Sequence, residues 1–171
     1  MVVTEIVDKL QDSLNAGDVD ALLDLFAEDA AVTIPALSPR TGSDQIRALF
    51  DFCVGIKVRW DFKESRLTDF GVECAVDQFD GWANLMGVAP LQYEPFRITI
   101  ADDRIKSIEG SWSETTLMTL GQAVEEFTPW ALENHPELFD GDGDYRYSRQ
   151  VGAGFIAAAE EWMSLKEGRR G

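Results

Sequence analysis

The spacing of the apolar residues changes twice along this chain, and those changes limit the folds that it can adopt. Up to Cys53 the apolar side chains recur every three or four positions, as on one face of a helix. Between Val58 and Trp112 they alternate with polar residues, as in half-buried strands. From Leu120 the helical spacing returns. Helices, then an antiparallel sheet, then further helices are the order of an α+β domain.

The elements expected before the sheet are two helices, a strand and a third helix. Asp18 is placed to cap the second helix, and Pro35 to end the strand. The predicted ranges are a helix over 3–14, a short helix carrying Leu22, Leu25 and Phe26, a strand over 30–34, and a helix from 43 to 53.

The sheet itself is predicted from three alternating segments and a returning strand. The alternating segments are 58–62, 72–76 and 96–100, and a tight turn at 101–103 leads into 104–113. Ile105 is out of phase with Ile108 and Trp112, which predicts a bulge near Lys106 and Ser107. Further helices are expected over 120–131 and 151–162, with a break at His135-Pro136 between them.

The charge of the chain excludes several classes of partner. Thirty-one acidic residues against fifteen basic ones give a net charge of −16, and the basic residues form no patch apart from Arg169-Arg170 at the tail. Nucleic acid and anionic membrane surfaces would repel such a protein. No apolar run is long enough to span a membrane, and the N-terminus lacks the features of a signal peptide. We therefore expect a cytoplasmic protein with neither nucleic acid nor membrane as a partner.

The two cysteines, Cys53 and Cys74, give no metal-binding spacing and no disulfide framework. Two buried free thiols are the simplest interpretation. With a single histidine, His135, neither a histidine-based zinc site nor a serine or cysteine catalytic triad is expected. The sequence therefore predicts neither a metal nor a cofactor.

Several motifs resemble the opening and the later hairpin of SnoaL-like and ketosteroid-isomerase-like proteins, within the nuclear-transport-factor-2-like superfamily. They lie at residues 14–22 (LNAGDVDAL), 25–30 (LFAEDA), 41–46 (TGSDQI), 85–90 (LMGVAP) and 96–98 (FRI), and the resemblance covers residues 3–115. It implies a cone, in which a curved antiparallel sheet and the N-terminal helices close an apolar cavity, and a homodimer formed through the sheet. The predicted boundaries are 1–116 for this domain and 117–171 for a helical extension packed on it.

The resemblance also allows a comparison with the catalytic groups of the steroid isomerases. Those enzymes use a carboxylate base, a tyrosine and a protonated aspartic acid. The positions that match the base and the tyrosine hold Ile34 and Leu10, which are apolar. The third position matches Glu94, which strand alternation places on the same face as Phe96. Glu94 is thus the candidate acid of an apolar cavity, where burial would raise its pKa. The alternative is a solvated side chain at the start of the strand.

Seven apolar residues are the candidate ligand contacts. For the two tryptophans among them, packing in the core is an equal alternative. The seven are Leu10, Ile34, Phe50, Trp60, Phe96, Ile108 and Trp112.

Two polar features have simpler structural interpretations than functional ones. His135 precedes Pro136 in a helix-ending turn, where a satisfied or solvated ring is expected rather than a catalytic one. Asp140, Asp142 and Asp144 have the first spacings of a calcium loop, but Tyr145 stands where that loop needs glycine, so a solvated turn is favoured.

Three functions are compatible with these observations. The first is a protein that binds a small, mostly apolar molecule in its cavity. The second is a cofactor-independent isomerase, hydrolase or dehydratase with Glu94 as acid and Asp61 or Asp77 as its partner, although alternation turns both aspartates away from the apolar face. The third is an interaction module that uses the C-terminal helices. An enzyme should bring two titratable groups together inside the cavity, whereas a binding protein needs one or none.

Overall fold

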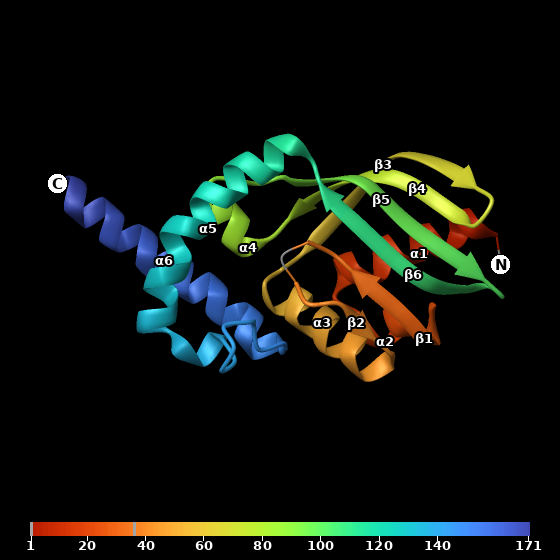
Figure 1. The fold of residues 1–171 in the computed structure, drawn as a ribbon, viewed down its shortest axis with the longest axis horizontal. Helices are drawn as coiled ribbons and strands as arrows, with labels where there is room; N and C mark the ends of the chain where they lie inside the picture. Colours follow the sequence, from red (N-terminus) through yellow and green to blue (C-terminus); the bar gives the residue numbers. More distant parts are fainter. Residues whose placement is uncertain (1, 36) are drawn as a thin grey trace.

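The computed structural model describes residues 2–35 and 37–171, which form an α+β structure around a curved, unclosed sheet of six strands (Figure 1). The helices before and within the sheet region are α1 (Val3–Ala16), α2 (Val19–Leu23), α3 (Ser43–Gly55) and α4 (Gly81–Met86). The strands are β1 (Phe26–Thr33), β2 (Arg40–Thr41), β3 (Arg59–Thr68), β4 (Gly71–Phe79), β5 (Leu91–Ala101) and β6 (Arg104–Trp112). The chain ends with α5 (Glu114–Asn134), a short 3-10 turn η1 (Pro136–Leu138) and α6 (Arg149–Arg170).

The strand order of the sheet is β2-β1-β6-β5-β4-β3. β3, β4, β5 and β6 form an antiparallel meander, as expected from the alternating segments. β1 pairs with β6 in parallel, which corrects the expectation of a wholly antiparallel sheet. The parallel pair is possible because the chain passes through α3, α4 and the four strands β2 to β5 before β6 returns beside β1.

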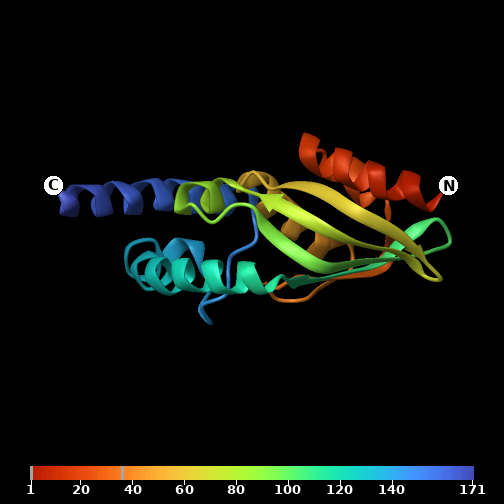
Figure 2. The ribbon, with the colours of Figure 1, turned by 90° about the horizontal axis from the view of Figure 1, so that it is seen from above.

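Helices α1, α2 and α3 lie against one side of the curved sheet (Figures 1 and 2). Their buried residues recur at helical spacing and include Ile6, Leu10 and Leu14 of α1 and Leu49 and Phe50 of α3. Burying such a face supplies most of the stability of an amphipathic helix. The sheet and these helices therefore share one apolar core.

The edge strand β3 is covered by polar side chains of α1. The Asn15 side chain donates to the Trp60 carbonyl and accepts from the Trp60 N–H, both at 2.9 Å, and Gln11 accepts from the Phe62 N–H at 2.8 Å. An exposed edge strand would otherwise leave these backbone groups free to pair with another chain. Asn15 of the LNAGD motif thus fixes α1 to the sheet.

Three local predictions differ from the structure. Leu25 and Phe26 lie outside α2, which ends at Leu23, and Phe26 begins β1 because Phe26, Ala30 and Val32 all point into the core from one extended strand. α4 overlaps residues 85–90, which resemble part of the family's later hairpin. Its six residues are too few to show a helical pattern in the sequence. β2 was not predicted and has two residues. The bulge expected near Lys106 is confirmed, since Thr99 pairs with Ser107 but Ile100 pairs with Ile105.

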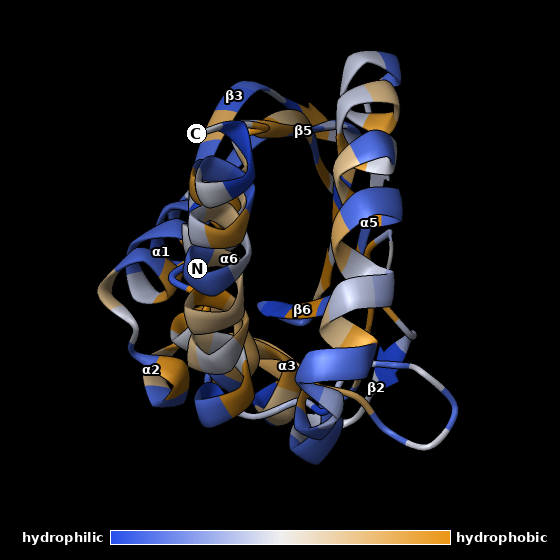
Figure 3. Cartoon of the chain, turned by 90° about the vertical axis from the view of Figure 1, so that its left-hand side faces the viewer, coloured by the Kyte–Doolittle hydropathy of each residue, from blue (hydrophilic) through white to orange (hydrophobic). Residues whose placement is uncertain are grey.

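The two long C-terminal helices pack on the same core, and the break between them falls at His135-Pro136, as predicted. α6 approaches α3 very closely, because a Cβ atom at Gly152 would lie 2.3 Å from the Phe52 carbonyl oxygen. Figure 3 shows the molecule from the end where α5 and α6 lie beside each other, with the sheet behind them. The boundary placed at residue 116 stays a prediction. Among the described residues, none of the helices has the length and apolar character to cross a membrane.

Candidate functional site

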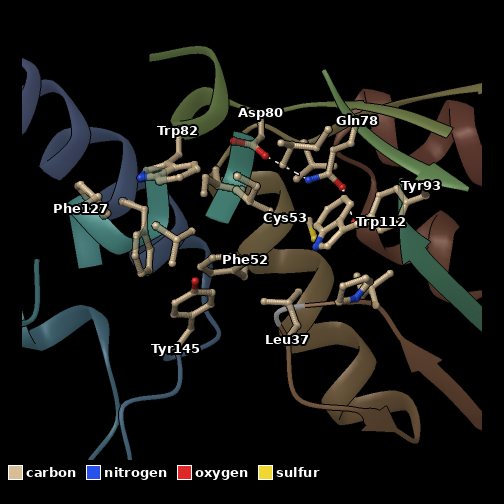
Figure 4. A pocket seen from close by; sticks show the side chains of 18 of the residues that line it. Leu37, Phe52, Cys53, Gln78, Asp80, Trp82, Tyr93, Trp112, Phe127 and Tyr145 are labelled. Carbon is tan, nitrogen blue, oxygen red and sulfur yellow. Dashed lines mark hydrogen bonds between the residues drawn. The ribbon is translucent and has the colours of Figure 1, made fainter. Parts of the chain in front are cut away.

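A cavity of about 110 Å³ lies where the buried face of the sheet passes beyond α3 and meets α5 and α6 (Figure 4). Its walls come from the β1–β2 loop, α3, β4, β5, β6, α4, both C-terminal helices and the loop between them. Most of the lining side chains are aliphatic or aromatic. The lining residues include Ile34, Leu37, Phe52, Cys53, Gln78, Asp80, Trp82, Tyr93, Trp112, Leu120, Phe127 and Tyr145.

Three polar side chains of the cavity, those of Tyr93, Gln78 and Asp80, form one hydrogen-bonded chain along one wall. The Tyr93 hydroxyl and the Trp60 indole N–H both donate to Oε1 of Gln78, each at 2.9 Å. Nε2 of Gln78 donates to Oδ2 of Asp80 at 3.1 Å. Figure 4 shows Gln78 between Tyr93 and Asp80. The chain joins the packed core, through Trp60, to the cavity.

The orientation of the Gln78 amide follows from its neighbours. An indole N–H can only donate, so the amide oxygen must face Trp60 and the amide nitrogen must face Asp80. The other oxygen of Asp80 accepts from the Ala83 N–H at 2.7 Å and caps α4. Asp80 is therefore held from two sides, by a strand residue and by a helix N-terminus.

Burial controls the protonation of the groups in this cavity. It raises the pKa of Asp80, which is 5% exposed, because the charged carboxylate loses its hydration, although hydrogen bonds from Ala83, Gln78 and Trp82 oppose that effect. It also raises the pKa of the Cys53 thiol to about 12 and that of Tyr93 well above its ordinary value. Cys53 and Tyr93 thus stay neutral at neutral pH.

Aromatic pairs form much of the remaining wall. Tyr93 and Trp112 stack with ring centroids 4.2 Å apart, and Trp82 meets Phe127 edge to face at 5.6 Å. Phe52 stacks on Tyr145 at 5.9 Å. Aromatic pairs have preferred geometries, and here they make these parts of the cavity wall apolar.

Two loops meet at the edge of the cavity. The Ser38 N–H donates to the Tyr147 hydroxyl at 3.3 Å, and the Ser38 hydroxyl donates to the Asp144 carboxylate. The Arg40 guanidinium lies over the Tyr147 ring, 3.5 Å from its centroid. These contacts join the β1–β2 loop, which carries Leu37, to the loop between α5 and α6, which carries Tyr145.

The comparisons with known proteins agree with this architecture. The model of the SnoaL-like domain matches residues 7–108, which is more than half of the chain. The chain belongs to the SnoaL-like family. Among curated proteins, none matches the sequence.

Solved structures similar to this SnoaL-like protein share its fold at low sequence identity. One is an NTF2-like protein of unknown function from Cytophaga hutchinsonii, with 13% identity, a TM-score of 0.56, and 69% of this chain and 96% of that chain covered. A second is a candidate polyketide cyclase from Sinorhizobium meliloti, with 20% identity, a TM-score of 0.55, and 65% and 100% covered. A third is SalBIII, an epoxide hydrolase/cyclase-like enzyme in pyran ring formation of the polyether salinomycin, with 21% identity, a TM-score of 0.52, and 67% and 92% covered.

The structure turns Glu94 away from the cavity. Glu94 is exposed although Phe96, two residues later, is fully buried. The pairing of β5 shifts on both sides between Tyr93 and Phe96, so a bulge at Glu94-Pro95 reverses the alternation. The face predicted for Glu94 is therefore wrong, and Tyr93 points inward in its place. A catalytic role for Glu94 stays a prediction to which this geometry lends no support.

The seven predicted ligand contacts divide into two groups. Ile34 and Trp112 line the cavity. The other five lie in the packed core with at most 1% of each side chain exposed, outside the cavity wall, and their role in ligand binding stays a prediction. These are Leu10, Phe50, Trp60, Phe96 and Ile108.

The remaining polar candidates lie away from the cavity. Asp61 and Asp77 are on the outer face of the sheet, as strand alternation predicted, and Asp77 pairs with Lys63. His135 ends α5 with its ring nitrogens 3.2 Å from Glu137 and 2.9 Å from Glu161.

The acidic loop forms a turn, and both cysteines are buried. Asp140 accepts the N–H groups of Asp142 and Asp144 at 2.9 Å each, so its carboxylate closes a turn. Cys53 and Cys74 are buried free thiols, as predicted. The homodimer implied by the resemblance stays a prediction.

Sequence reasoning missed Gln78 and Asp80, although the sequence holds a signal for both. The alternation of Val72, Cys74 and Val76 extends to positions 78 and 80, which are buried like the three before them. Polar residues on the buried face of a strand require hydrogen-bond partners, and such groups mark a candidate site.

Proposed function

We propose that this SnoaL-like protein binds one small, mostly apolar molecule in the cavity between the sheet and α5 and α6. The observation that carries the proposal is the composition of that cavity. Aliphatic and aromatic side chains form most of the wall, and the hydrogen-bonded side chains of Gln78, Asp80 and Tyr93 lie together along one side. Ligand sites in proteins commonly combine an apolar lining with a few convergent polar groups.

The size of the cavity limits the ligand. A volume of about 110 Å³ is comparable with an apolar cavity of about 150 Å³ that accepts a benzene molecule in another protein. We therefore propose a ligand with a single ring or a short branched chain in the enclosed space. A larger molecule would extend past the two loops at the edge of the cavity.

Two leucines of α5 provide a matched test. Leu120 lines the cavity, whereas Leu132 is 42% exposed on the same helix. Benzyl alcohol should shift the NMR signals of cavity residues in the natural protein and in a Leu132→Trp variant. A Leu120→Trp variant should show no such shifts, because the indole occupies the space. Equal shifts in both variants, or shifts confined to surface residues, would contradict the proposal.

A second candidate function is cofactor-independent proton transfer, with Asp80 as the acid or base in place of Glu94. Asp80 is a buried carboxyl at the cavity wall, and the raised pKa that burial gives it suits a general acid. The Tyr93 hydroxyl, joined to it through Gln78, is a second titratable group at the same wall.

Hydrogen–deuterium exchange at the carbon next to the carbonyl of cyclohexanone tests this second function. If Asp80 moves protons, the protein should accelerate the exchange above the buffer rate, and Asp80→Asn should return it to that rate. Glu94→Gln is the matched control and should leave the acceleration intact. Exchange at the buffer rate with the natural protein would rule out this chemistry for small ketones.

A further inference from the structure

Asp80 is a carboxyl group at the cavity wall, and in its ionised form it would have no opposite charge beside it. Among the described residues, no lysine, arginine or histidine lines the cavity. The titratable groups that face Asp80 are Cys53 of α3, Tyr93 of β5 and Tyr145 of the α5–α6 loop. Burial raises the pKa of each of them, so they stay neutral. A carboxylate in an apolar space without an opposite charge is unfavourable, and a ligand can supply that charge.

Asp80 has acceptor capacity left for a ligand. Two carboxylate oxygens offer about four acceptor positions. The Ala83 N–H and the Gln78 amide fill one on each oxygen, and a further backbone hydrogen bond comes from Trp82. Of the four positions, one therefore remains for a donor, and Asp80 is one of the residues that line the cavity.

The aromatic walls favour a cation at the same place. Trp82, two residues after Asp80, lines the cavity with Phe127, Phe52, Tyr145, Tyr93 and Trp112. Figure 4 shows the indole nitrogen of Trp82 on the side of its ring away from Asp80, so that N–H does not compete for the carboxylate. Ring faces attract ammonium groups, most strongly where water is excluded. The net charge of −16 also raises the local concentration of cations around the protein.

We propose that the ligand of this cavity is a primary or secondary amine in its protonated form, with the ammonium N–H donating to Asp80 and the apolar body packed between the aromatic walls. This inference rests on the function proposed above and narrows it to a ligand class. The inference also excludes carboxylates and phosphates from the cavity. In the part of the chain that the structure describes, no basic side chain lines the wall to pair with them, and Asp80 would repel them.

Three probes of nearly equal size and different charge test the inference by calorimetry. They are benzylamine, which is cationic at neutral pH, benzyl alcohol, which is a neutral donor, and benzoate. The natural protein should bind benzylamine about tenfold more tightly than benzyl alcohol and should not bind benzoate. In Asp80→Asn the preference of amine over alcohol should fall to about onefold, since the amide carries no charge.

The outcomes separate this inference from the function on which it rests. If none of the probes binds, both fall. If benzyl alcohol binds in the cavity as tightly as benzylamine, or if benzoate binds, the cavity still takes small molecules but the amine assignment is overturned. An Asp80→Asn variant that keeps the full preference for the amine also overturns it.

A measurement on the natural protein covers the case in which the variant fails to fold. Asparagine is a good N-cap residue, so α4 should persist, but the amide would place a second donor against Gln78. Lowering the pH through the raised pKa of Asp80 protonates the carboxylate and should weaken benzylamine binding, while benzyl alcohol binding changes little. Benzylamine affinity that does not depend on pH in this range overturns the proposal.

Discussion

The buried face of the sheet is packed solid at one end and hollow at the other. Under α1 and α3 it is filled by Phe50, Trp60 and Phe96, each at most 1% exposed. Beyond α3 the same face carries Gln78 and Tyr93, which help to enclose the cavity with α5 and α6. The difference shows that apolar alternation along a strand fixes which face is buried but not whether the space above it is filled.

The largest effect expected from this contrast is the loss of a ring at the packed end. Phe50→Ala should lower the free energy of unfolding by about 3–5 kcal/mol, because it leaves a void in a fully packed core. Phe70→Ala is the matched control, since Phe70 is 74% exposed, and it should cost less than about 0.5 kcal/mol. Urea denaturation of both variants measures the difference. Similar costs would show that Phe50 is no better packed than an exposed side chain, and the packed end of the contrast would be lost.

A smaller effect is expected when volume is added at each end. Leu49→Phe, in the packed core, should cost about 1–3 kcal/mol because neighbouring side chains must shift. Leu120→Phe, at the cavity wall, should cost less because the larger side chain enters open space. Thermal unfolding of the two variants compares them directly. A Leu120→Phe variant that is the less stable of the two would show that the cavity is not open to a ring.

The smallest effect concerns the dependence of stability on pH. Burial raises the pKa of Asp80 in the folded protein, so the folded state holds that proton more tightly than the unfolded chain does. The stabilisation is complete below the ordinary aspartate pKa and is lost as the pH rises through the raised value. The Asp80→Asn side chain cannot ionise, so this variant should gain stability relative to the natural protein as the pH rises through the raised pKa of Asp80. A tenfold change in proton affinity corresponds to about 1.4 kcal/mol.

Glu73 on the outer face of the sheet serves as the control of opposite sign. Hydrogen bonds from Arg66 and Arg97 lower its pKa, so its contribution is present above the ordinary glutamate pKa and is lost as the pH falls through the lowered value. Relative to the natural protein, Glu73→Gln should therefore gain stability toward low pH, whereas Asp80→Asn should gain it toward high pH. Urea denaturation across the pH range checks both, and two differences of the same sign would contradict the buried assignment of Asp80.

Much of the fold could be predicted from the sequence because long elements bury regular patterns. The spacing of Leu10 and Leu14 in α1 and the alternation of β4 give the right structures, and Ile105 revealed the bulge in β6. Short elements have too few residues for a pattern, which is why α4 was missed. The parallel pairing of β1 with β6 depends on contacts between distant segments, which a local pattern does not contain.

The site was harder to predict, because one bulge decides its chemistry. Simple alternation puts Glu94 inside, but the extra residue at Glu94-Pro95 puts Tyr93 there. The position of the cavity depends on where α5 and α6 meet the sheet, and this follows from close contacts such as Gly152 against α3. Gln78 and Asp80 were within reach of the sequence, since they continue the buried face of β4 as polar residues.

The cavity wall is built from two parts of the chain, and substitutions in the two parts have different consequences. Its polar side, with Gln78, Asp80 and Tyr93, belongs to the segment that matches the SnoaL-like domain, whereas Leu120, Phe127 and Tyr145 follow that segment. Substitutions in the later residues can reshape the room for a ligand while the hydrogen-bonded side keeps its geometry. The room for a ligand can thus change through α5, α6 and the loop between them, while the groups that hold Asp80 in place stay the same.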